Sequence, residues 1–387
     1  MSDLAPLATL PPLEIAGRLE RLQSRLGDAG PGHSPVDALL VTAPANIRWL
    51  TGFSGSAGLL LVGGSRAWLT TDGRYRTQAD EQLAAAGLHP DVELVIGDAR
   101  AQREALRDAV ARSAARRVGL EAASVSWAAK EDWAALLEDV ELAPTRGVVE
   151  GLRVTKDAGE VARMARAAAI ADAALAELLP SLSARAVGER AVTESSFAAD
   201  LDHAMRRRGA EEPAFETIVA SGENSAKPHA RPGPRHVRVG DPVVIDFGAT
   251  FDGYRSDMTR TVFVGEPPDD EMSRVWRVVR DSQQAGVDVV RPGVAAVEVD
   301  RTCRGRIADA GWGERFEHGT GHGVGLDIHE APAVGPGSTA ILEPGAVVTV
   351  EPGVYLPGRG GVRIEDTLVV TETGSRALTT FPKEVAV

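Results

Sequence analysis

Residues 318–330 read HGTGHGVGLDIHE and place three of the chain's eight histidines, together with four glycines, within thirteen residues. The glycine spacing matches neither of the phosphate-binding patterns GxxxxGK(S/T) and GxGxxG. His318 and His322 are four residues apart, as zinc-binding histidines on a helix are, but each glycine between them disfavours a helix by about 1 kcal/mol. An HExxH motif is also absent. We therefore predict an extended or looped segment whose glycines let another part of the backbone come close.

A first pair of carboxylates is expected on the strands around residue 250. Asp246 lies within the apolar run VVIDF, where burying a carboxylate is costly unless it is paired or bound to a metal. Asp252 and Gly253 form a strong two-residue hairpin signal, which would place Asp246 opposite Thr259. Asp257 is two residues from Thr259 and therefore shares a face of the sheet with Asp246. The hairpin predicts two carboxylates directed at one point.

A second pair of carboxylates follows from the same reasoning. Glu351 lies in VVTVEPG and Glu365 in VRIEDT. A hairpin centred on Arg359 would place Glu351 opposite Thr367, with Glu365 on the same face. Four carboxylates on two hairpins would repel one another strongly without cations. With the imidazole of His322 they form a ligand set that suits two divalent metal ions, such as manganese, cobalt or zinc.

The elements that would position these residues fall into two groups. The first 150 residues alternate between strand-like runs and helical patterns, which indicates an α/β domain. Strands are expected at 38–42, 58–62 and 67–71, and helices at about 13–26, 103–115 and 130–138.

The remaining residues indicate an α+β domain with antiparallel hairpins. Asp157 and Glu160 resemble a capping box at the start of a helix of about twenty residues. Thr193 is expected to cap a second helix that ends at Gly209. Two further helices are expected at about 269–290 and 295–310.

Size and composition limit the classes of function. A chain of 387 residues suggests two domains, which we place at 1–150 and 151–387. The formal charge of −13 argues against nucleic acid as a partner. No run of eighteen apolar residues predicts a membrane span, and the first residues do not resemble a secretory signal. The single cysteine, Cys303, excludes an intrachain disulfide and fits a cytoplasmic protein.

The candidate ligands lie in motifs that together resemble the pita-bread metallopeptidases, in particular the aminopeptidase P and Xaa-Pro dipeptidase (prolidase) group. The matching motifs are SGENSAKPH (221–229), DFGATFDGYRSDMTRT (246–261), HGTGHGVGLDIHEAP (318–332), TVEPGVY (349–355) and GGVRIEDT (360–367). The earlier segments NIRWLTGFSGSAG (46–58) and TDGRYRTQA (71–79) resemble the amino domain of the same family. The resemblance implies a pita-bread catalytic domain that follows an α/β, creatinase-like amino domain.

The resemblance also implies roles for individual residues. Asp246 would bind one metal, Asp257 and Glu365 would bridge both metals, and His322 and Glu351 would complete the second site. The family's histidines that contact substrate and stabilise the tetrahedral intermediate correspond to His229, His318 and His329, and an arginine beside the bridging glutamate corresponds to Arg363. Glu351 is expected to accept a proton from the attacking water. The expected cofactor is a pair of divalent ions, with manganese preferred over cobalt or zinc.

The activity implied is hydrolysis of the bond between an N-terminal residue and proline. Several dipeptidases of the family carry an arginine directly after the HExP segment, where this chain has Ala333. We therefore favour aminopeptidase P, which accepts longer peptides, and keep Xaa-Pro dipeptidase as the alternative.

Other members of the fold are less consistent with the sequence. A methionine aminopeptidase does not normally carry such an amino domain. Creatinase and non-catalytic binding modules lack metal ligands, whereas all five candidates are present here. Members of the family commonly form dimers or larger assemblies, which predicts a homodimer here. Residues 49–58 are expected to lie on a loop.

Overall fold

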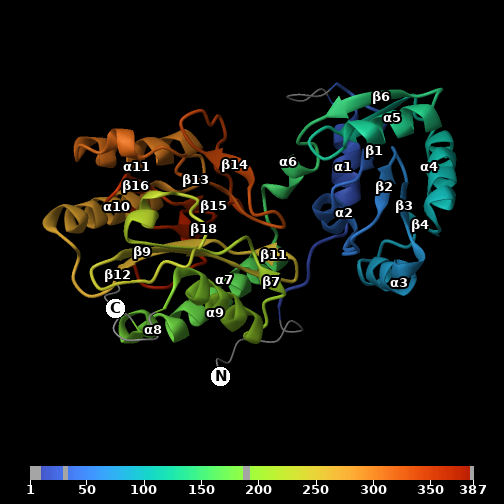
Figure 1. Cartoon of the computed structure of the whole chain (residues 1–387). Coiled ribbons are helices and arrows are strands. Elements are labelled where there is room, and N and C mark those ends of the chain that lie inside the picture. Colours follow the sequence, from blue (N-terminus) through green and yellow to red (C-terminus); the bar gives the residue numbers. More distant parts are fainter. Residues whose placement is uncertain (1–9, 29–33, 186–191, 384–387) are drawn as a thin grey trace. The chain divides into compact units, whose positions relative to one another are not determined.

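The computed structural model describes residues 10–28, 34–185 and 192–383. Its contacts divide the chain into two compact units (Figure 1). The amino-terminal unit comprises Glu14–Arg153. The carboxy-terminal unit runs from Val154 onwards and includes the described residues before Glu14. Pro11, for example, accepts a hydrogen bond from Arg163.

The amino-terminal unit is built on one mixed sheet with strand order β4-β3-β2-β1-β5-β6. The β1–β5, β5–β6 and β3–β4 pairs are parallel, whereas β1–β2 and β2–β3 are antiparallel. Its elements in chain order are α1 (Arg18–Leu26), β1 (Ala38–Val41), α2 (Pro44–Thr51), β2 (Leu59–Val62), β3 (Ala67–Thr71), α3 (Arg76–Ala85), β4 (Val92–Ile96), α4 (Ala99–Ser113), β5 (Arg117–Glu121), α5 (Trp127–Leu136), β6 (Glu141–Thr145) and α6 (Glu150–Arg153).

The predicted strands of this unit are confirmed, and its helices differ mainly at their starts. Helix α1 begins at Arg18, because Gly17 before it adopts a left-handed conformation with φ 81°. Helix α4 begins a turn earlier than expected, because the Asp98 side chain caps it by accepting from the Ala101 amide.

One expectation for this unit is partly wrong. Residues 49–58 were expected to form a loop, but Trp49 lies within α2 and is only 2% exposed. The loop begins at Gly52, whose left-handed conformation (φ 76°) ends the helix. The burial of the apolar face of α2 therefore extends the helix to Thr51, although the small residues that follow predict a loop.

The carboxy-terminal unit pairs its strands antiparallel wherever the described residues form ladders. Its elements are α7 (Ala158–Leu178), α8 (Pro180–Arg185), α9 (Glu194–Arg207), β7 (Glu212–Pro213), β8 (Ile218–Ser221), β9 (Pro242–Phe247), β10 (Ala249–Phe251), β11 (Tyr254–Arg255), β12 (Met258–Phe263), α10 (Asp270–Val289), α11 (Ala296–Asp309), β13 (Gly321–Gly323), β14 (Glu330–Val334), β15 (Val347–Val350), β16 (Gly353–Leu356), β17 (Gly360–Arg363), β18 (Asp366–Val370) and β19 (Ser375–Ala377).

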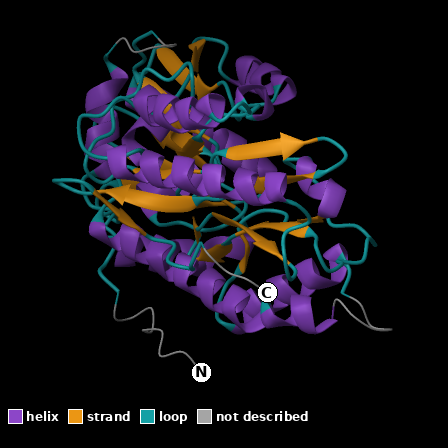
Figure 2. Ribbon diagram, turned by 90° about the vertical axis from the view of Figure 1, so that its left-hand side faces the viewer, coloured by secondary structure: helices purple, strands orange, loops and turns teal. Residues whose placement is uncertain are grey.

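Two pairs of helices cover the strands of this unit from opposite sides (Figures 1 and 2). Helices α7 and α9 pack with β8, β9, β10 and β12 in one apolar core. Helices α10 and α11 pack with β14, β15, β16, β17 and β18 in a second core. No helix within the described residues combines the length and apolar character needed to cross a bilayer. The strands therefore meet between two helical layers.

The predicted helix starts in this unit are confirmed. Asp157 and Glu160 form a capping box at the start of α7, and the Thr193 side chain accepts from the Ser196 amide at the start of α9. Helices α10 and α11 lie within the expected ranges. Local capping signals were therefore sufficient to place the starts of α7 and α9.

The first predicted hairpin is confirmed, and the second is wrong by two residues. Asp246 pairs with Thr259, as expected. In the second hairpin Thr367 pairs with Thr349 rather than with Glu351. The turn is centred on Gly358, which adopts the left-handed conformation (φ 75°), and not on Arg359. Because strand faces repeat every two residues, this shift leaves the predicted faces unchanged.

Replacing Gly358 with alanine should lower the free energy of unfolding by about 1 kcal/mol, because an L-residue is strained at positive φ. No other atom lies within 4 Å of the position that the new Cβ would occupy, so the cost would be backbone strain alone. Urea denaturation would measure it. Gly374→Ala is the matched control, since its Cβ also meets no atom within 4 Å and its φ lies outside the left-handed region. An equal decrease in the free energy of unfolding in both variants would contradict the assigned turn.

Candidate metal centre

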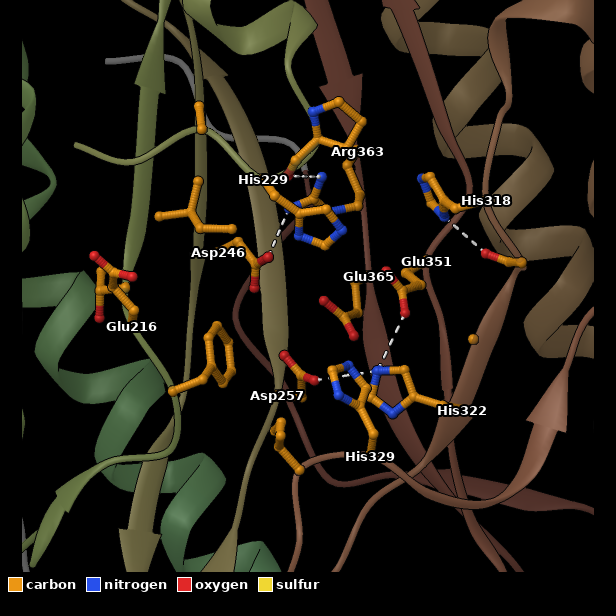
Figure 3. A pocket seen from close by; sticks show the side chains of 18 of the residues that line it. Glu216, His229, Asp246, Asp257, His318, His322, His329, Glu351, Arg363 and Glu365 are labelled. Carbon is orange, nitrogen blue, oxygen red and sulfur yellow. Dashed lines mark hydrogen bonds and ion pairs between the residues drawn. The ribbon is translucent and has the colours of Figure 1, made fainter. Parts of the chain in front are cut away.

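A cavity of about 480 Å³ in the carboxy-terminal unit gathers the residues singled out from the sequence (Figure 3). Its lining includes all five candidate metal ligands and the four candidate substrate-side residues: Asp246, Asp257, His322, Glu351, Glu365, His229, His318, His329 and Arg363. Asp246 lies in β9 and Asp257 directly precedes β12, both strands of the first apolar core, whereas Glu351 and Glu365 border strands of the second. The cavity therefore lies where the two halves of this unit meet.

The histidine-rich segment is extended, as predicted, and β13 lies between β14 and β15. A Cβ added at Gly321 would clash with the Thr349 carbonyl oxygen, and one at Gly323 would clash with the Ala331 carbonyl oxygen. These glycines therefore bring the backbone that carries His322 close to both neighbouring strands.

Three carboxylates converge closely in the cavity. One oxygen each from Asp246, Asp257 and Glu365 lie within 4.8 Å of one another. Burial, followed by repulsion from neighbouring carboxylates, raises the pKa values of Asp257 and Glu365 well above their usual range. Burial and the charge of Asp246 likewise raise the pKa of Glu351 to about 8. Such a cluster is costly to ionise unless a cation compensates it.

Two fully buried oxygens of this cluster have no hydrogen-bond partner among the described residues. Asp246 Oδ2 accepts from Arg363 at 2.6 Å, but its buried Oδ1 accepts from no group. Glu365 Oε2 accepts from Thr259 at 2.7 Å, and its buried Oε1 is likewise without a donor. A buried acceptor without a partner costs about 1–3 kcal/mol. Bound cations would satisfy both atoms, so these residues fit a metal centre.

The orientation of His322 supports the same conclusion. Its Nδ1 is 3.0 Å from the Gly323 carbonyl oxygen, which can only accept, so Nδ1 carries the proton. Burial lowers the pKa of His322 to about 4, which keeps the ring neutral. Nε2 therefore presents a lone pair to Glu351 Oε1 at 3.4 Å and to Asp257 Oδ2 at 3.6 Å. A lone pair that faces carboxylates is favourable when a metal ion lies between them.

Arg363 and His318 belong to one chain of hydrogen bonds. Arg363 donates to Asp246, to the Pro228 carbonyl and to the Tyr355 hydroxyl. The Tyr355 oxygen is 2.8 Å from His318 Nε2, and His318 Nδ1 is 2.7 Å from the Gly319 carbonyl oxygen. Both nitrogens of His318 are therefore engaged, and burial lowers its pKa to about 4.

The other two histidines differ from His318 in exposure. His229 and His329 line the cavity but remain exposed. The ring of His329 packs edge-on against His322, with centroids 4.3 Å apart. Their exposure leaves these two rings accessible to a substrate.

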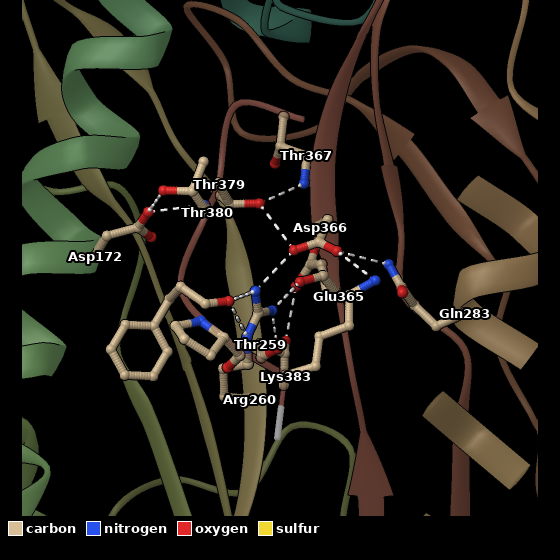
Figure 4. Close-up of polar contacts among 12 residues, drawn as sticks. Asp172, Thr259, Arg260, Gln283, Glu365, Asp366, Thr367, Thr379, Thr380 and Lys383 are labelled. Atoms are coloured by element: carbon tan, nitrogen blue, oxygen red, sulfur yellow. Dashed lines mark hydrogen bonds and ion pairs between the residues drawn. The ribbon is translucent and has the colours of Figure 1, made fainter. Parts of the chain in front are cut away.

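A polar cluster of five residues behind the ligands was not identified from the sequence (Figure 4). We call it the Asp366 cluster; its central carboxylate accepts from Arg260, Gln283, Thr379 and Lys383. Gln283 also donates to the Val350 carbonyl. Val350 and Asp366 are paired across β15 and β18, and each is adjacent to a candidate ligand. The cluster therefore holds the strand junctions at Glu351 and Glu365.

A buried ion pair that was also not predicted supports the loop before β14. Lys156 lies 3.1 Å from Glu330, with side chains 1% and 8% exposed. Glu330 also accepts from the Asp327 amide. Since Glu330 follows His329 directly, the pair restrains the backbone that carries this histidine.

Comparisons with known proteins match both units. Residues 162–372 match the model of metallopeptidase family M24, and residues 18–155 match that of the creatinase/prolidase N-terminal domain. The Xaa-Pro dipeptidase of Pyrococcus horikoshii is 33% identical over 351 residues, which cover 90% of this chain and 94% of that protein.

Two solved structures show the same architecture. The Xaa-Pro dipeptidase from Bacillus anthracis superimposes with a TM-score of 0.89 at 37% identity, covering 96% of this chain and all of that one. The X-Pro aminopeptidase from Thermotoga maritima gives 0.82 at 35% identity, covering 91% and 98%. The resemblance and the predicted fold class, a pita-bread domain after a creatinase-like α/β domain, are confirmed.

Glu351→Gln should stabilise the metal-free protein by about 1–3 kcal/mol near pH 7, because glutamine keeps the shape of the side chain but cannot ionise. A raised carboxyl pKa means that stability is lost as the pH rises towards about 8. The difference in the free energy of unfolding between Glu351→Gln and the wild type should therefore vanish near pH 4 and grow towards pH 8. Urea denaturation of chelator-treated protein at several pH values would measure it.

The exposed Glu343 supplies the control, since Glu343→Gln should change stability little at any of these pH values. Adding manganese should stabilise the wild type more than Glu351→Gln. A variant that is less stable than the wild type in chelator at pH 8 would contradict the charge repulsion described above.

Proposed function

Because the chain belongs to metallopeptidase family M24, we propose that it is an Xaa-Pro dipeptidase that uses two divalent metal ions. The observation that carries this proposal is the convergence of Asp246, Asp257 and Glu365 at one point of the cavity. Beside them, the lone pair of His322 faces Asp257 and Glu351. The Xaa-Pro specificity is proposed from the relatives, of which two named above are Xaa-Pro dipeptidases.

We propose that Asp246, Asp257, His322, Glu351 and Glu365 hold the metals, with Asp257 and Glu365 shared between them. Carboxylate oxygens and one imidazole suit manganese, and cobalt or zinc are the alternatives. When bound, the ions supply positive charge that polarises a peptide carbonyl and favours ionisation of water.

The protein's own side chains would complete the reaction. Glu351 is the proposed proton acceptor, since its carboxylate lines the cavity beside His322. His329 and His229 are exposed in the cavity and would donate to the substrate carbonyl and steady its proline side. His318 would contact substrate through its ring, because both of its nitrogens are hydrogen-bonded. Arg363 holds Asp246 in place through a hydrogen bond of 2.6 Å.

The cavity offers an apolar surface that suits a proline ring. Phe215, Ile218 and Ile328 line it, together with Pro228 and Pro232. Its volume of about 480 Å³ lies within the range of small-ligand sites. These features are consistent with a short peptide that carries proline in its second position.

The relatives favour the dipeptidase over aminopeptidase P, which Ala333 had led us to prefer. Ala333 is exposed on β14 and is not among the described residues that line the cavity. The lack of an arginine at this position therefore weighs less than the names of the relatives. The homodimer remains a prediction.

The proposed activity predicts a higher kcat/KM for Xaa-Pro dipeptides than for the matching Xaa-Pro-Yaa peptides after loading with manganese. Asp257→Asn and Glu365→Gln should each lower the activity at least about a hundredfold, because loss of a ligand costs more than loss of its supporting contacts. Hydrolysis assays with manganese, cobalt and zinc would test both expectations.

Glu343→Gln serves again as the matched control for carboxylate loss and should retain activity. Full activity in a verified metal-free preparation would refute the metal centre. A wild type at least tenfold better on tripeptides would instead support aminopeptidase P.

A further inference from the structure

We propose that Arg231 binds the free carboxylate of the dipeptide and so sets the preference for short substrates. This inference rests on the proposed Xaa-Pro activity and identifies a specificity-determining residue for it. A dipeptide ends directly after its proline, so a cation at the rim of the cavity would distinguish it from longer peptides.

Arg231 is the available cation among the described residues that line the cavity. That lining contains two arginines and no lysine. Arg363 is 3% exposed, and its guanidinium already donates to Asp246, Tyr355, Thr259 and the Pro228 carbonyl. The side chain of Arg231 is 84% exposed. A group that lines the cavity with this exposure lies at its rim, where a substrate's end would emerge.

The partner of Arg231 can be exchanged at low cost. Arg231 Nε lies 3.5 Å from Glu216 Oε2, and the Glu216 side chain is 65% exposed. Exposed ion pairs contribute only about 0–1 kcal/mol. Figure 3 shows Glu216 on the side of the cavity opposite His318. The pair therefore keeps the guanidinium near the rim without holding it firmly, and a substrate carboxylate can replace Glu216.

A buried glutamate fixes the loop that presents Arg231. Glu194 is 1% exposed and accepts from the amide and hydroxyl of Ser221 and from Asn224. It also accepts from the Gly233 amide. One carboxylate therefore ties both ends of the segment 221–233. His229 and Arg231 lie between these ends, two residues apart, so that a proline-side contact and a carboxylate contact come from the same restrained loop.

The surroundings of Arg231 suit the substrate's last residue. Ala230 and Pro232 flank it in the chain, and both line the cavity. Ile218 adds a third apolar side chain. A proline ring against these groups would place its carboxylate within reach of a flexible arginine side chain.

Arg231→Gln should raise KM for an Xaa-Pro dipeptide about five- to tenfold, since a partly exposed charge-assisted hydrogen bond is lost. It should leave kcat, and the kcat/KM for the neutral Xaa-Pro amide, within about twofold of the wild-type values. Glu216→Gln should act in the opposite direction and lower KM for the dipeptide, because it removes the competing carboxylate. Raising the salt concentration should increase KM for the dipeptide in the wild type but not in Arg231→Gln.

Arg238→Gln is the matched control, because this arginine is also exposed, lies seven residues further along and lines a different cavity. It should leave all of these values unchanged. The role of Arg231 would be overturned if Arg231→Gln lowered kcat/KM equally for the dipeptide and its amide, or lowered it for neither. A wild type that hydrolyses neither compound after metal loading would instead refute the Xaa-Pro activity itself.

Discussion

Repulsion among buried carboxylates is the constraint on which the catalytic unit depends. Asp246, Asp257 and Glu365 direct oxygens at one point, and Glu351 lies beside them. Without cations, this arrangement would favour either protonation or separation of the strands. The surrounding structure therefore has to hold the carboxylates close together in the absence of a cation that would offset their repulsion.

Hydrogen bonds on the far side of the strands oppose that repulsion. The Asp366 cluster fixes the residues adjacent to Glu351 and Glu365 from the side of α10. Arg260 strengthens this support, because it donates to both the Asp366 side chain and the Glu365 carbonyl. Glu351 and Glu365 are therefore positioned partly through their backbone neighbours, and Glu365 Oε1 has no donor among the described residues.

The sequence predicted the ligand strands well because the signals were local. A two-residue turn set the register of Asp246 against Thr259, and the period of two kept Glu351 and Glu365 on the correct face despite an error at Gly358. The supporting contacts could not be predicted in this way. Gln283 meets Asp366 across 83 positions of sequence, and Lys156 meets Glu330 across 174. Such pairs become visible only when helices and strands are placed in space.

The two sides of the cavity differ in how far their side chains are buried. The metal side is buried, and its strands are joined by ladders and the Asp366 cluster. On the other side, the segment 221–233 is held at its ends by Glu194 and in its middle by Arg363, which donates to the Pro228 carbonyl. The side chains of His229 and Arg231 nevertheless remain exposed. Because Arg363 joins the Pro228 carbonyl to Asp246, a change in the backbone of this segment should affect the carboxylates, whereas a change in its exposed side chains should not. Under the proposed function, substrate preference is therefore more easily changed through these exposed side chains than through the buried carboxylates, because the side chains carry few of the contacts that hold the site together.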